Sequence, residues 1–422
     1  MIAANLIIIE VVYWTGDLTK KNVLVWIGQF LGLHLAFVLA VQLVLVARLP
    51  WLDRRIGMDR LTSWHRLTGF TVFWLVLLHP TFILLGYARL DRLGFLREFA
   101  HLATTQVNVL FGMIAAALVV VVAAVSVRAA RRRLSYETWH TVHFLLYAVI
   151  TLAVLHQISE GTSFRNTAIE QVYWWALWAF AIGSLLAGRF VLPLVRNARH
   201  GFRVTAVVPE SDDVVSVYVT GRHLDRLPAA AGQFFIWRFL GHNRWWQANP
   251  FSLSAAPDGQ TLRLTAKASG RTSAGLRHVP VGTRVFAEGP YGAFTAMHRT
   301  RESTLLIAGG VGITPVRALL EELTGPVTVL YRVHRDAEAV LHGELTELAR
   351  PRGARIHLLT GRTSADNNPF APENLRALVP DVTDRDVYVC GPPAMTAAVV
   401  RSLRALGVPG PQIHDERFSL AS

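Results

Sequence analysis

Two histidines within one long apolar stretch are the residues of this chain best suited to unusual chemistry. The stretch runs from Leu61 to Tyr87 and carries His65 and His79, fourteen residues apart. Ionisable side chains are costly at membrane depth, so they usually mark a site or a pathway. On an α-helix this separation is a rise of roughly 21 Å and almost four turns. The two imidazoles are therefore predicted to lie on nearly the same side of one helix, one toward each membrane face.

A second apolar stretch, from Tyr136 to Gln157, contains a matching pair. It carries His140, His143 and His156, and the last two are thirteen residues apart, a rise of about 20 Å. Two facing helices with histidines at equal depths can hold two haems, each iron bound by one imidazole from each helix. On an ideal helix this spacing leaves the two rings more than about 90° apart, so a tilt or a local distortion is required. His140 has no better spacing to His156, so His143 is the predicted ligand.

A single histidine in an apolar helix is more often a hydrogen-bonded core residue than a metal ligand. Four histidines at matched depths on two helices reverse that expectation. We therefore predict two b-type haems, an inner one held by His65 and His143 and an outer one held by His79 and His156.

The chain has 422 residues, 52% of them hydrophobic, and the apolar runs are concentrated before about residue 195. The first run is shorter than the about 20 residues that a span needs, so a short helix is expected there. These runs predict an all-α membrane bundle of about six helices, followed by soluble domains. The only cysteine is Cys390, which excludes an intrachain disulfide and a cysteine-based metal site. The runs are approximately 2–14, 23–47, 62–87, 107–127, 137–157 and 170–192.

The net charge of +13 is carried by arginines near the helix ends, which fits a membrane protein and not a nucleic-acid-binding protein. The positive-inside rule places the arginine-rich connections and the C-terminal half in the cytoplasm, with the bundle in the plasma membrane. His65 and His143 then fall near the inner face, and His79 and His156 near the outer face. The arginines concerned are Arg48, Arg54, Arg55, Arg60, Arg128, Arg131, Arg132, Arg133, Arg196, Arg199 and Arg203.

From Phe202 to Phe294, short β runs alternate with turn residues, as in a small antiparallel barrel. This region contains Asn-Pro-Phe-Ser-Leu-Ser at 249–254 and Lys-Ala-Ser-Gly-Arg-Thr-Ser at 267–273. The second motif is predicted to be a strand, a glycine turn and a short helix that begins near Ser273. A helix N-terminus with free N–H groups suits a pyrophosphate.

From Ser303 onward, strands and helices alternate. Thr304–Ala308 is predicted to be a buried strand, 309–315 a glycine loop, and Val316–Glu322 the helix that this loop opens. Cys-Gly-Pro-Pro at 390–393 follows the last strand of a predicted parallel sheet, at the edge where doubly wound sheets bind ligands. The other strands of this sheet are expected at Val327–Val333, Arg355–Leu359 and Asp386–Val389.

In this order, the motifs of residues 200–422 resemble the ferredoxin–NADP reductase family of flavin domains. With the histidine pairs added, the whole chain resembles the ferric reductase and NADPH oxidase superfamily. The resemblance implies a transmembrane di-haem domain at 1–195, an FAD-binding β-barrel domain at 200–298 and an NAD(P)-binding α/β domain at 299–422.

The resemblance also implies roles for individual residues. Cys390 and Ser252 become catalytic candidates, together with Phe418, which would cover the flavin until nicotinamide displaces it. For Phe251 and Phe418 the alternative role is barrel packing. The residues implied to bind FAD are Asn249, Pro250, Phe251, Ser252, Lys267, Gly270, Ser273 and Phe418. Those implied to bind the nicotinamide nucleotide are Gly309, Gly310, Gly312, Thr314, Pro315, Gly391 and Pro392.

Two positions depart from the superfamily pattern. The flavin motif begins with Asn249, where histidine or arginine is usual, and this predicts loosely held FAD. Ile83 stands where animal oxidases place a further histidine beyond the outer ligand, which weakens the expectation of a dedicated superoxide generator. Near the end of the strand Val327–Val333, Arg332 and Arg335 are suited to a 2′-phosphate, which favours NADPH over NADH.

Together these features predict a transmembrane oxidoreductase, an NAD(P)H-dependent flavocytochrome b. Electrons would pass from cytoplasmic NAD(P)H through FAD and two haems to an extracytoplasmic small molecule, such as dioxygen, with superoxide formation, or a ferric chelate. Three alternatives stay open: an electron-donor subunit for a periplasmic protein, a membrane-anchored flavin reductase without haem, and a transport protein whose histidines relay protons or metal ions.

Overall fold

The computed structural model describes residues 2–15, 22–127, 133–134, 136–161, 167–242, 247, 249–362 and 368–417. Phe418 and the predicted inner-side arginines Arg128, Arg131 and Arg132 lie outside these residues. The chain divides into two compact units. The helical unit comprises Met1–Arg48 and Leu61–Ala187, and the second unit comprises Leu49–Arg60 and Gly188–Ser422.

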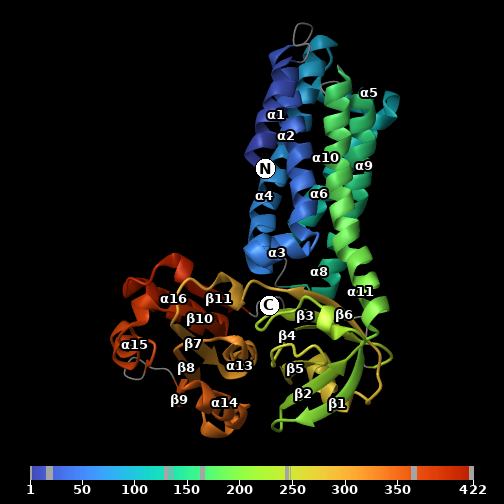
Figure 1. Cartoon of the computed structure of the whole chain (residues 1–422). Helices are drawn as coiled ribbons and strands as arrows, with labels where there is room; N and C mark the ends of the chain where they lie inside the picture. Colours follow the sequence, from blue (N-terminus) through green and yellow to red (C-terminus); the bar gives the residue numbers. More distant parts are fainter. Residues whose placement is uncertain are drawn as a thin grey trace. The chain divides into compact units, whose positions relative to one another are not determined.

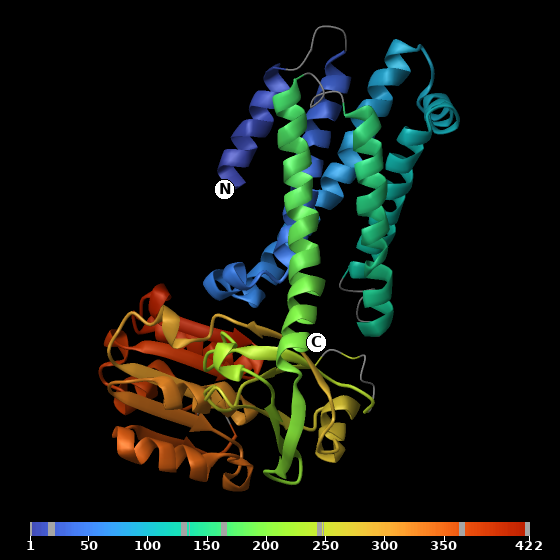
Figure 2. The ribbon, with the colours of Figure 1, turned by 45° about the vertical axis from the view of Figure 1, so that its right-hand side comes forward.

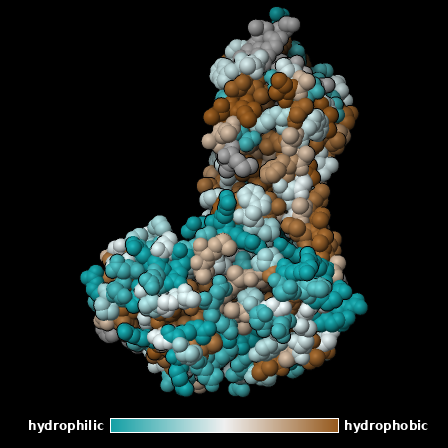
Figure 3. All heavy atoms as spheres, in the orientation of Figure 1, coloured by the Kyte–Doolittle hydropathy of each residue, from teal (hydrophilic) through white to brown (hydrophobic). Residues whose placement is uncertain are grey.

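The helical unit consists of long apolar helices that run side by side (Figures 1 and 2). In the part of the chain that is described, five segments are long and apolar enough to cross a membrane, and α1 (Ile2–Thr15) is a shorter apolar helix. Hydrophobic residues gather on the surface of this unit, whereas the surface of the second unit is mainly hydrophilic (Figure 3). The predicted helical membrane region is confirmed. The five segments are Val23–Val46, Met58–Leu90, Val107–Ser126, Thr138–Glu160 and Ala168–His200.

Helix starts in this unit follow from capping side chains. Asn22 precedes α2 (Val23–Val46), and its side chain accepts hydrogen bonds from the backbone N–H groups of Leu24 and Val25, both at 3.1 Å. Thr167 and Glu170 form a reciprocal capping box at the start of α10 (Ala168–Leu186). These bonds satisfy backbone donors that the first helical turn leaves without a partner.

Two apolar clusters hold the helices together. One joins α1, α2 and α10 around Phe37, Trp174 and Trp178. The other joins α4 (Met58–Leu90), α6 (Val107–Ser126) and α9 (Leu145–Glu160) around buried valines. The second cluster matters for function because α4 carries His65 and His79 and α9 carries His156, three of the four predicted haem ligands.

The helix that carries His143 and His156 is interrupted between them. α8 (Tyr136–His143) ends immediately before Phe144, and α9 begins at Leu145. The Phe144 N–H lies 3.1 Å from the His140 carbonyl oxygen and 3.2 Å from that of Thr141, a tightened turn of the 3₁₀ type. A 3₁₀-type turn rotates the chain by only about 20° per residue more than an α-helix, so it supplies a small part of the rotation that the thirteen-residue spacing of the two histidines requires.

The first half of the second unit contains two three-stranded antiparallel sheets, with strand orders β1-β2-β5 and β4-β3-β6. Their inner faces enclose a core that includes Val217, Trp237 and Leu264. The predicted antiparallel strands are present. In the described residues the two sheets are linked by the single bridges Arg203–Arg284 and Leu253–Leu264, and not by one continuous barrel ladder. The strands are β1 (Arg203–Pro209), β2 (Val214–Thr220), β3 (Phe234–Phe239), β4 (Asn249–Ser252), β5 (Thr261–Lys267) and β6 (Val285–Tyr291).

The second half is a five-stranded parallel sheet in the order β11-β10-β7-β8-β9, which confirms the predicted parallel sheet. α13 (Ile313–Glu322) and α14 (His342–Ala349) cover one face. α15 (Pro372–Leu378) and α16 (Pro393–Ala405) cover the other. The strands are β7 (Thr304–Gly309), β8 (Val327–Arg332), β9 (Arg355–Leu359), β10 (Asp386–Gly391) and β11 (Ile413–Arg417).

Two helix starts differ from the prediction. α13 begins at Ile313, three residues before the predicted start, because a proline at position 315 is compatible with the first helical turn. The short helix α12 (Arg271–Gly275) begins two residues before the predicted Ser273.

A connection between two apolar helices, residues 49–60, belongs to the second unit. Its helix α3 (Pro50–Ile56) contains Asp53, which is buried and accepts a hydrogen bond of 2.6 Å from the Gly292 N–H. Arg54 donates to the Pro228 carbonyl at 3.1 Å, and its own carbonyl lies 2.6 Å from His298 Nε2. These contacts attach the connection to the flavin-type sheets.

Candidate functional sites

His79 on α4 and His156 on α9 line the same cavity. Its volume is about 280 Å³, close to the lower end of the range for small-molecule sites. Most of its wall is apolar, and its polar lining includes Gln29, Gln157 and Glu160. The structure therefore brings the two predicted outer ligands together in one apolar chamber.

The hydrogen bonds of both rings leave the same nitrogen available. Nδ1 of His79 lies 2.7 Å from the Gly28 carbonyl oxygen, and Nδ1 of His156 lies 2.9 Å from that of Asn108. A carbonyl oxygen can only accept, so each Nδ1 carries the hydrogen and each Nε2 keeps its lone pair. Metal-ligating histidines are commonly fixed in this way.

Two glycines make room for these rings. A Cβ atom at Gly32 of α2 would lie 2.7 Å from Cε1 of His79, and one at Gly112 of α6 would lie 3.1 Å from Cγ of His156. With the cavity and the free Nε2 atoms, these glycines leave an arrangement of residues that fits a metal-containing cofactor such as haem. Neither glycine is predictable as a site residue, because its only signal in the sequence is its position within an apolar run.

His34 of α2 is a contrasting membrane histidine. Its Nδ1 lies 2.9 Å from the Phe30 carbonyl oxygen, and its Nε2 lies 3.3 Å from a carboxylate oxygen of Glu10. Both ring nitrogens are therefore engaged, so His34 does not offer the free Nε2 that a metal requires.

The predicted inner pair is also brought together. The ring centroids of His65 and His143 are 6.2 Å apart, with an interplanar angle of 72°. One metal bound by both imidazoles would need their rings this close, since metal–nitrogen bonds are about 2 Å long. Trp139 stacks on His143 at 5.0 Å, whereas the ring of His140 packs against Phe144 at 4.4 Å. His143 is thus the neighbour of His65.

The flavin motif lies on β4, paired with β3. Phe251 is half-buried, and its carbonyl accepts a hydrogen bond of 3.1 Å from Trp237 Nε1. Ser252 is buried, and its hydroxyl has no hydrogen-bond partner among the described residues. Asn249 Nδ2 donates to the Gln247 carbonyl at 3.1 Å, and Pro250 lies opposite Ile236 of β3. A regular strand therefore positions all four motif residues.

In the segment predicted to bind pyrophosphate, the backbone N–H groups are hydrogen-bonded to a side chain of the same segment. The Ser273 hydroxyl accepts hydrogen bonds from the N–H groups of Ser269 and Gly270, both at 3.0 Å. Lys267 ends β5 and pairs with Asp213 at 3.3 Å. The pKa of Asp213 is lowered mainly by a hydrogen bond from the Ser211 hydroxyl and, to a smaller extent, by Lys267. A phosphate at this turn would compete with the Ser273 hydroxyl for the two N–H groups.

The glycine loop packs directly on the segment after β10. A Cβ atom at Gly312 would overlap the Cys390 carbonyl, and one at Gly309 would lie 2.5 Å from Met395 Sδ. Gly310 has φ of +54°, a left-handed value that favours glycine. Thr314 and Pro315 are buried in the first turn of α13, and Gly391 and Pro392 immediately precede α16. The structure thus gathers these predicted nucleotide residues at the carboxyl edge of the sheet.

The two arginines predicted to bind a 2′-phosphate differ in accessibility. Arg332 is buried, and its guanidinium donates to the Thr360 carbonyl at 2.5 Å. The Arg335 side chain is 80% exposed and pairs with Glu338 at 2.8 Å. Only Arg335 of this pair presents its guanidinium to solvent at the sheet edge.

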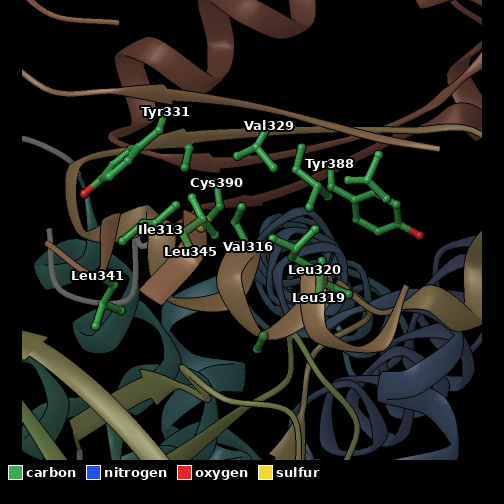
Figure 4. Packing of buried hydrophobic residues seen from close by; sticks show 14 of the residues in the cluster. Ile313, Val316, Leu319, Leu320, Val329, Tyr331, Leu341, Leu345, Tyr388 and Cys390 are labelled. Atoms are coloured by element: carbon green, nitrogen blue, oxygen red, sulfur yellow. The ribbon is translucent and has the colours of Figure 1, made fainter. Parts of the chain in front are cut away.

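Cys390 lies within the core between the sheet and α13, close to Ile313 and Val316 (Figure 4). Burial raises the pKa of the Cys390 thiol well above its usual value, and the carboxylates of Glu416 and Asp59 add to the shift. The neighbouring strand carries Glu416, whose pKa is also raised, first by burial and then by Asp59 and Asp53. Cys390 is therefore a neutral thiol covered by protein.

Comparisons with known proteins give separate matches for the helical region and for the parallel-sheet domain. Residues 31–154 match the family described as ferric reductase like transmembrane component, and residues 306–401 match the oxidoreductase NAD-binding domain. The ferredoxin reductase component of 3-ketosteroid-9-alpha-monooxygenase from Mycobacterium tuberculosis is 33% identical over 255 residues, covering 56% of this chain and 68% of that protein. A flavohemoprotein of Vibrio cholerae is 33% identical over 180 residues, covering 40% of this chain and 45% of that protein.

Among solved structures, the FAD/NAD-binding domain of nitric oxide dioxygenase from Vibrio cholerae is similar, with 26% identity and a TM-score of 0.43. That similarity covers 52% of this chain and 98% of the other. The sequence matches define a membrane oxidoreductase with an FAD/NAD-binding reductase module. The chain belongs to the ferric reductase and NADPH oxidase superfamily, in which a ferric reductase-like transmembrane domain is fused to such a module.

Proposed function

We propose that this protein carries electrons across the plasma membrane. The donor is cytoplasmic NADPH, with NADH as the weaker alternative, and the acceptor is an extracytoplasmic small molecule such as dioxygen or a ferric chelate. When bound, FAD converts a two-electron hydride into single electrons, and two bis-histidine b-type haems pass these on one at a time. The electrons would enter near His65 and His143 and leave near His79 and His156.

The observation that carries the proposal is the shared arrangement of His79 and His156. Both rings face one apolar cavity, and both hold Nδ1–H against a backbone carbonyl, so that both keep Nε2 free. The apolar wall excludes water from the iron ligands, and the glycines at 32 and 112 keep the rings where two ligands can meet one iron. A structural role in packing would need neither the shared cavity nor the matching tautomers.

The second unit would supply the electrons. Phe251 and Ser252 on β4 would lie against the flavin, while the glycine loop 309–312 and the start of α13 would hold the nucleotide. Arg335 would take the 2′-phosphate of NADPH, because its side chain is accessible and a guanidinium suits a phosphate. The Ser252 hydroxyl is free to donate a hydrogen bond to a ligand on β4.

Haem content tests the proposal. The purified parent should show a Soret band and contain two haems, and His79→Leu or His156→Leu should lower the content toward half. Flavin reduction by NADPH should persist in both variants. His34→Leu is the matched control, since His34 lies in the same bundle but has both nitrogens engaged, and it should keep both haems. Full occupancy in both outer variants would refute the assignment, and a parent without a Soret band would be a membrane-anchored flavin reductase.

Sealed vesicles test the direction of transfer. With the flavin unit enclosed, internal NADPH should reduce an impermeant external acceptor, and external NADPH should not. His79→Leu should abolish that reduction while a small dye on the flavin side is still reduced. External reduction at the parental rate in this variant would remove the outer site from the path. A requirement for an added periplasmic protein would favour an electron-donor subunit.

A further inference from the structure

A buried arginine connects the flavin-type sheets to the nucleotide domain. Arg263 of β5 donates through Nε to the Ser254 hydroxyl at 3.0 Å and through a terminal nitrogen to the Ser254 carbonyl at 2.6 Å. Its other terminal nitrogen lies 3.0 Å from both carboxylate oxygens of Glu344 on α14. Ser254 follows Ser252 of the flavin motif by two residues. Arg263 thus joins the end of that motif to the nucleotide domain.

The ionic chain continues into α13. Glu344 also pairs with Arg317, and Arg317 pairs with Glu321, one helical turn further along. Glu321 in turn accepts a hydrogen bond of 2.8 Å from the N–H of Ala256. This network therefore begins at Ser254 and ends at the backbone N–H of Ala256, two residues further along the chain. Its charged members, in order, are Arg263, Glu344, Arg317 and Glu321.

The same helix carries the nucleotide loop. α13 begins at Ile313, directly after the glycine loop, and Arg317 and Glu321 lie on its second and third turns. The side chains of Arg263 and Arg317 are each only 6% exposed. Their partners Glu344 and Glu321 are 30% exposed, so the arginines lose most of their hydration while the pairs gain little net stability, and a role in fixing geometry is a better-attested use of such groups.

We propose that Arg263 and Arg317 are positioning residues for hydride transfer from nicotinamide to flavin. This inference rests on the proposed function. The transfer moves two electrons and one proton from the reduced nicotinamide to the flavin, and a second proton from solvent completes the reduction. Neither arginine touches the reacting atoms. Arg263 holds the end of the flavin motif through Ser254, and Arg317 holds the helix that follows the nucleotide loop, so the network sets the separation of the two ligands.

Hydride transfer is sensitive to that separation. A misplacement of about 1 Å at reacting atoms can lower a rate by about 100-fold. Loss of the network should therefore slow the transfer step itself, with the affinity for NADPH and the FAD content changed much less. A network that only stabilised the fold would change the thermal midpoint and leave the transfer rate alone.

Anaerobic stopped-flow absorbance of the full chain, following flavin bleaching at saturating NADPH, measures the step. Arg317→Met should lower the limiting rate by at least about tenfold, and Arg317→Lys, which keeps the charge, should restore part of it. The dissociation constant for NADPH should stay within about threefold of the parent. NADPH deuterated at the transferred position should show an isotope effect in the slowed variant, which identifies hydride transfer as the slow step.

Arg385→Met is the matched control. Arg385 is also a buried arginine, paired with Asp381 at 2.8 Å and bonded to Thr328, but its described bonds stay within the nucleotide domain at the edge opposite the glycine loop. This variant should lower the thermal midpoint while the limiting rate stays within about twofold of the parent. A parental rate in Arg317→Met, or an equal loss in the control, would overturn the proposal.

A milder variant covers the case in which Arg317→Met fails to fold. Glu344→Gln keeps the size of a partly exposed side chain but removes its charge and replaces one acceptor oxygen by an NH2 donor. Because the remaining oxygen cannot serve both arginines, this variant should slow hydride transfer with FAD content unchanged, and a parental rate would again overturn the proposal. A parent whose flavin is not bleached by NADPH would instead contradict the proposed function, so the two failures are distinguishable.

Discussion

The ring of His79 lies so close to Gly32 that a Cβ atom at this glycine would stand 2.7 Å from its Cε1 atom. The same ring is held by the carbonyl oxygen of Gly28, one turn before Gly32 on the same helix and 2.7 Å from Nδ1. α2 thus orients the imidazole through the Gly28 carbonyl, and it leaves room for the ring because position 32 is a glycine. A side chain at position 32 would force the ring away from the cavity it shares with His156.

Gly32→Ala is therefore expected to lower haem content toward half and to remove the outer haem selectively. The added methyl group needs the space of the ring, and a displaced ring no longer points Nε2 into the cavity. Gly183→Ala in α10 is the control, because outside the adjoining backbone of its own helix no described atom lies within 4 Å of a Cβ atom there. Pyridine haemochrome assays measure both variants. Two haems retained in Gly32→Ala would mean that the ring is not a ligand in this orientation.

The sequence was sufficient to predict the matching depths of these histidines, because helical rise relates position 65 to 79 and position 143 to 156. It was not sufficient to predict the groups that orient them. The carbonyls of Gly28 and Asn108 belong to other helices, α2 and α6, and which carbonyl faces which ring depends on helix packing. The spacing required a tilt or a local distortion, and the position of the tightened turn at Phe144 follows from local hydrogen bonds.

Arg335→Gln is expected to reduce the preference for NADPH. Its guanidinium is exposed, and its surface pair with Glu338 is weak enough to be exchanged for a 2′-phosphate. The kcat/KM for NADPH should fall by about tenfold, a loss of about 1.4 kcal/mol, while that for NADH should change less than twofold. Arg404→Gln, at an exposed arginine of α16, should change neither value. Equal losses with both nucleotides would contradict a role in recognising the 2′-phosphate.

Glu416→Gln is expected to change how stability depends on pH. Burial, Asp59 and Asp53 raise the Glu416 pKa, so the folded state holds its proton more tightly than the unfolded state. This contribution is fully present below the unfolded pKa, near 4.5, and is lost as pH rises through the folded pKa. In that window the parent loses up to about 1.4 kcal/mol per pH unit, and a glutamine avoids the loss.

Thermal unfolding followed by release of FAD fluorescence measures this effect. The midpoint of Glu416→Gln minus that of the parent should increase from pH 5 to pH 8, by about 2–4 °C for each kcal/mol. Glu373→Gln, at an exposed position of α15, should show a difference that does not vary with pH. A Glu416→Gln difference that is constant, or that falls with pH, would show that Glu416 is not a buried acid in the folded protein.

Burial is the property that the sequence conveyed least well in the second unit. The motifs placed the glycine loop and the end of β10 at one sheet edge, and the structure has them there. The same motifs gave equal weight to Arg332 and Arg335, although one is buried and the other is exposed. Similarly, Asp53 lies in the arginine-rich connection that follows the second apolar run, and nothing in that pattern indicates its burial. Its burial against Gly292 depends on a contact 239 residues away, which no local pattern records.

Cys390 is expected to resist alkylation in the folded protein. Burial raises the pKa of its thiol, so the reactive thiolate is scarce at pH 8, and the surrounding core excludes the reagent. Iodoacetamide should label the native chain more than about tenfold more slowly than the chain in denaturant. Because the chain has no other cysteine, the label is unambiguous, and Cys390→Ser gives the background. Arg404→Cys in that background should react rapidly at an exposed site of α16. Equal rates for Cys390 in the native and denatured chains would place the thiol at an accessible surface and contradict its packing against α13.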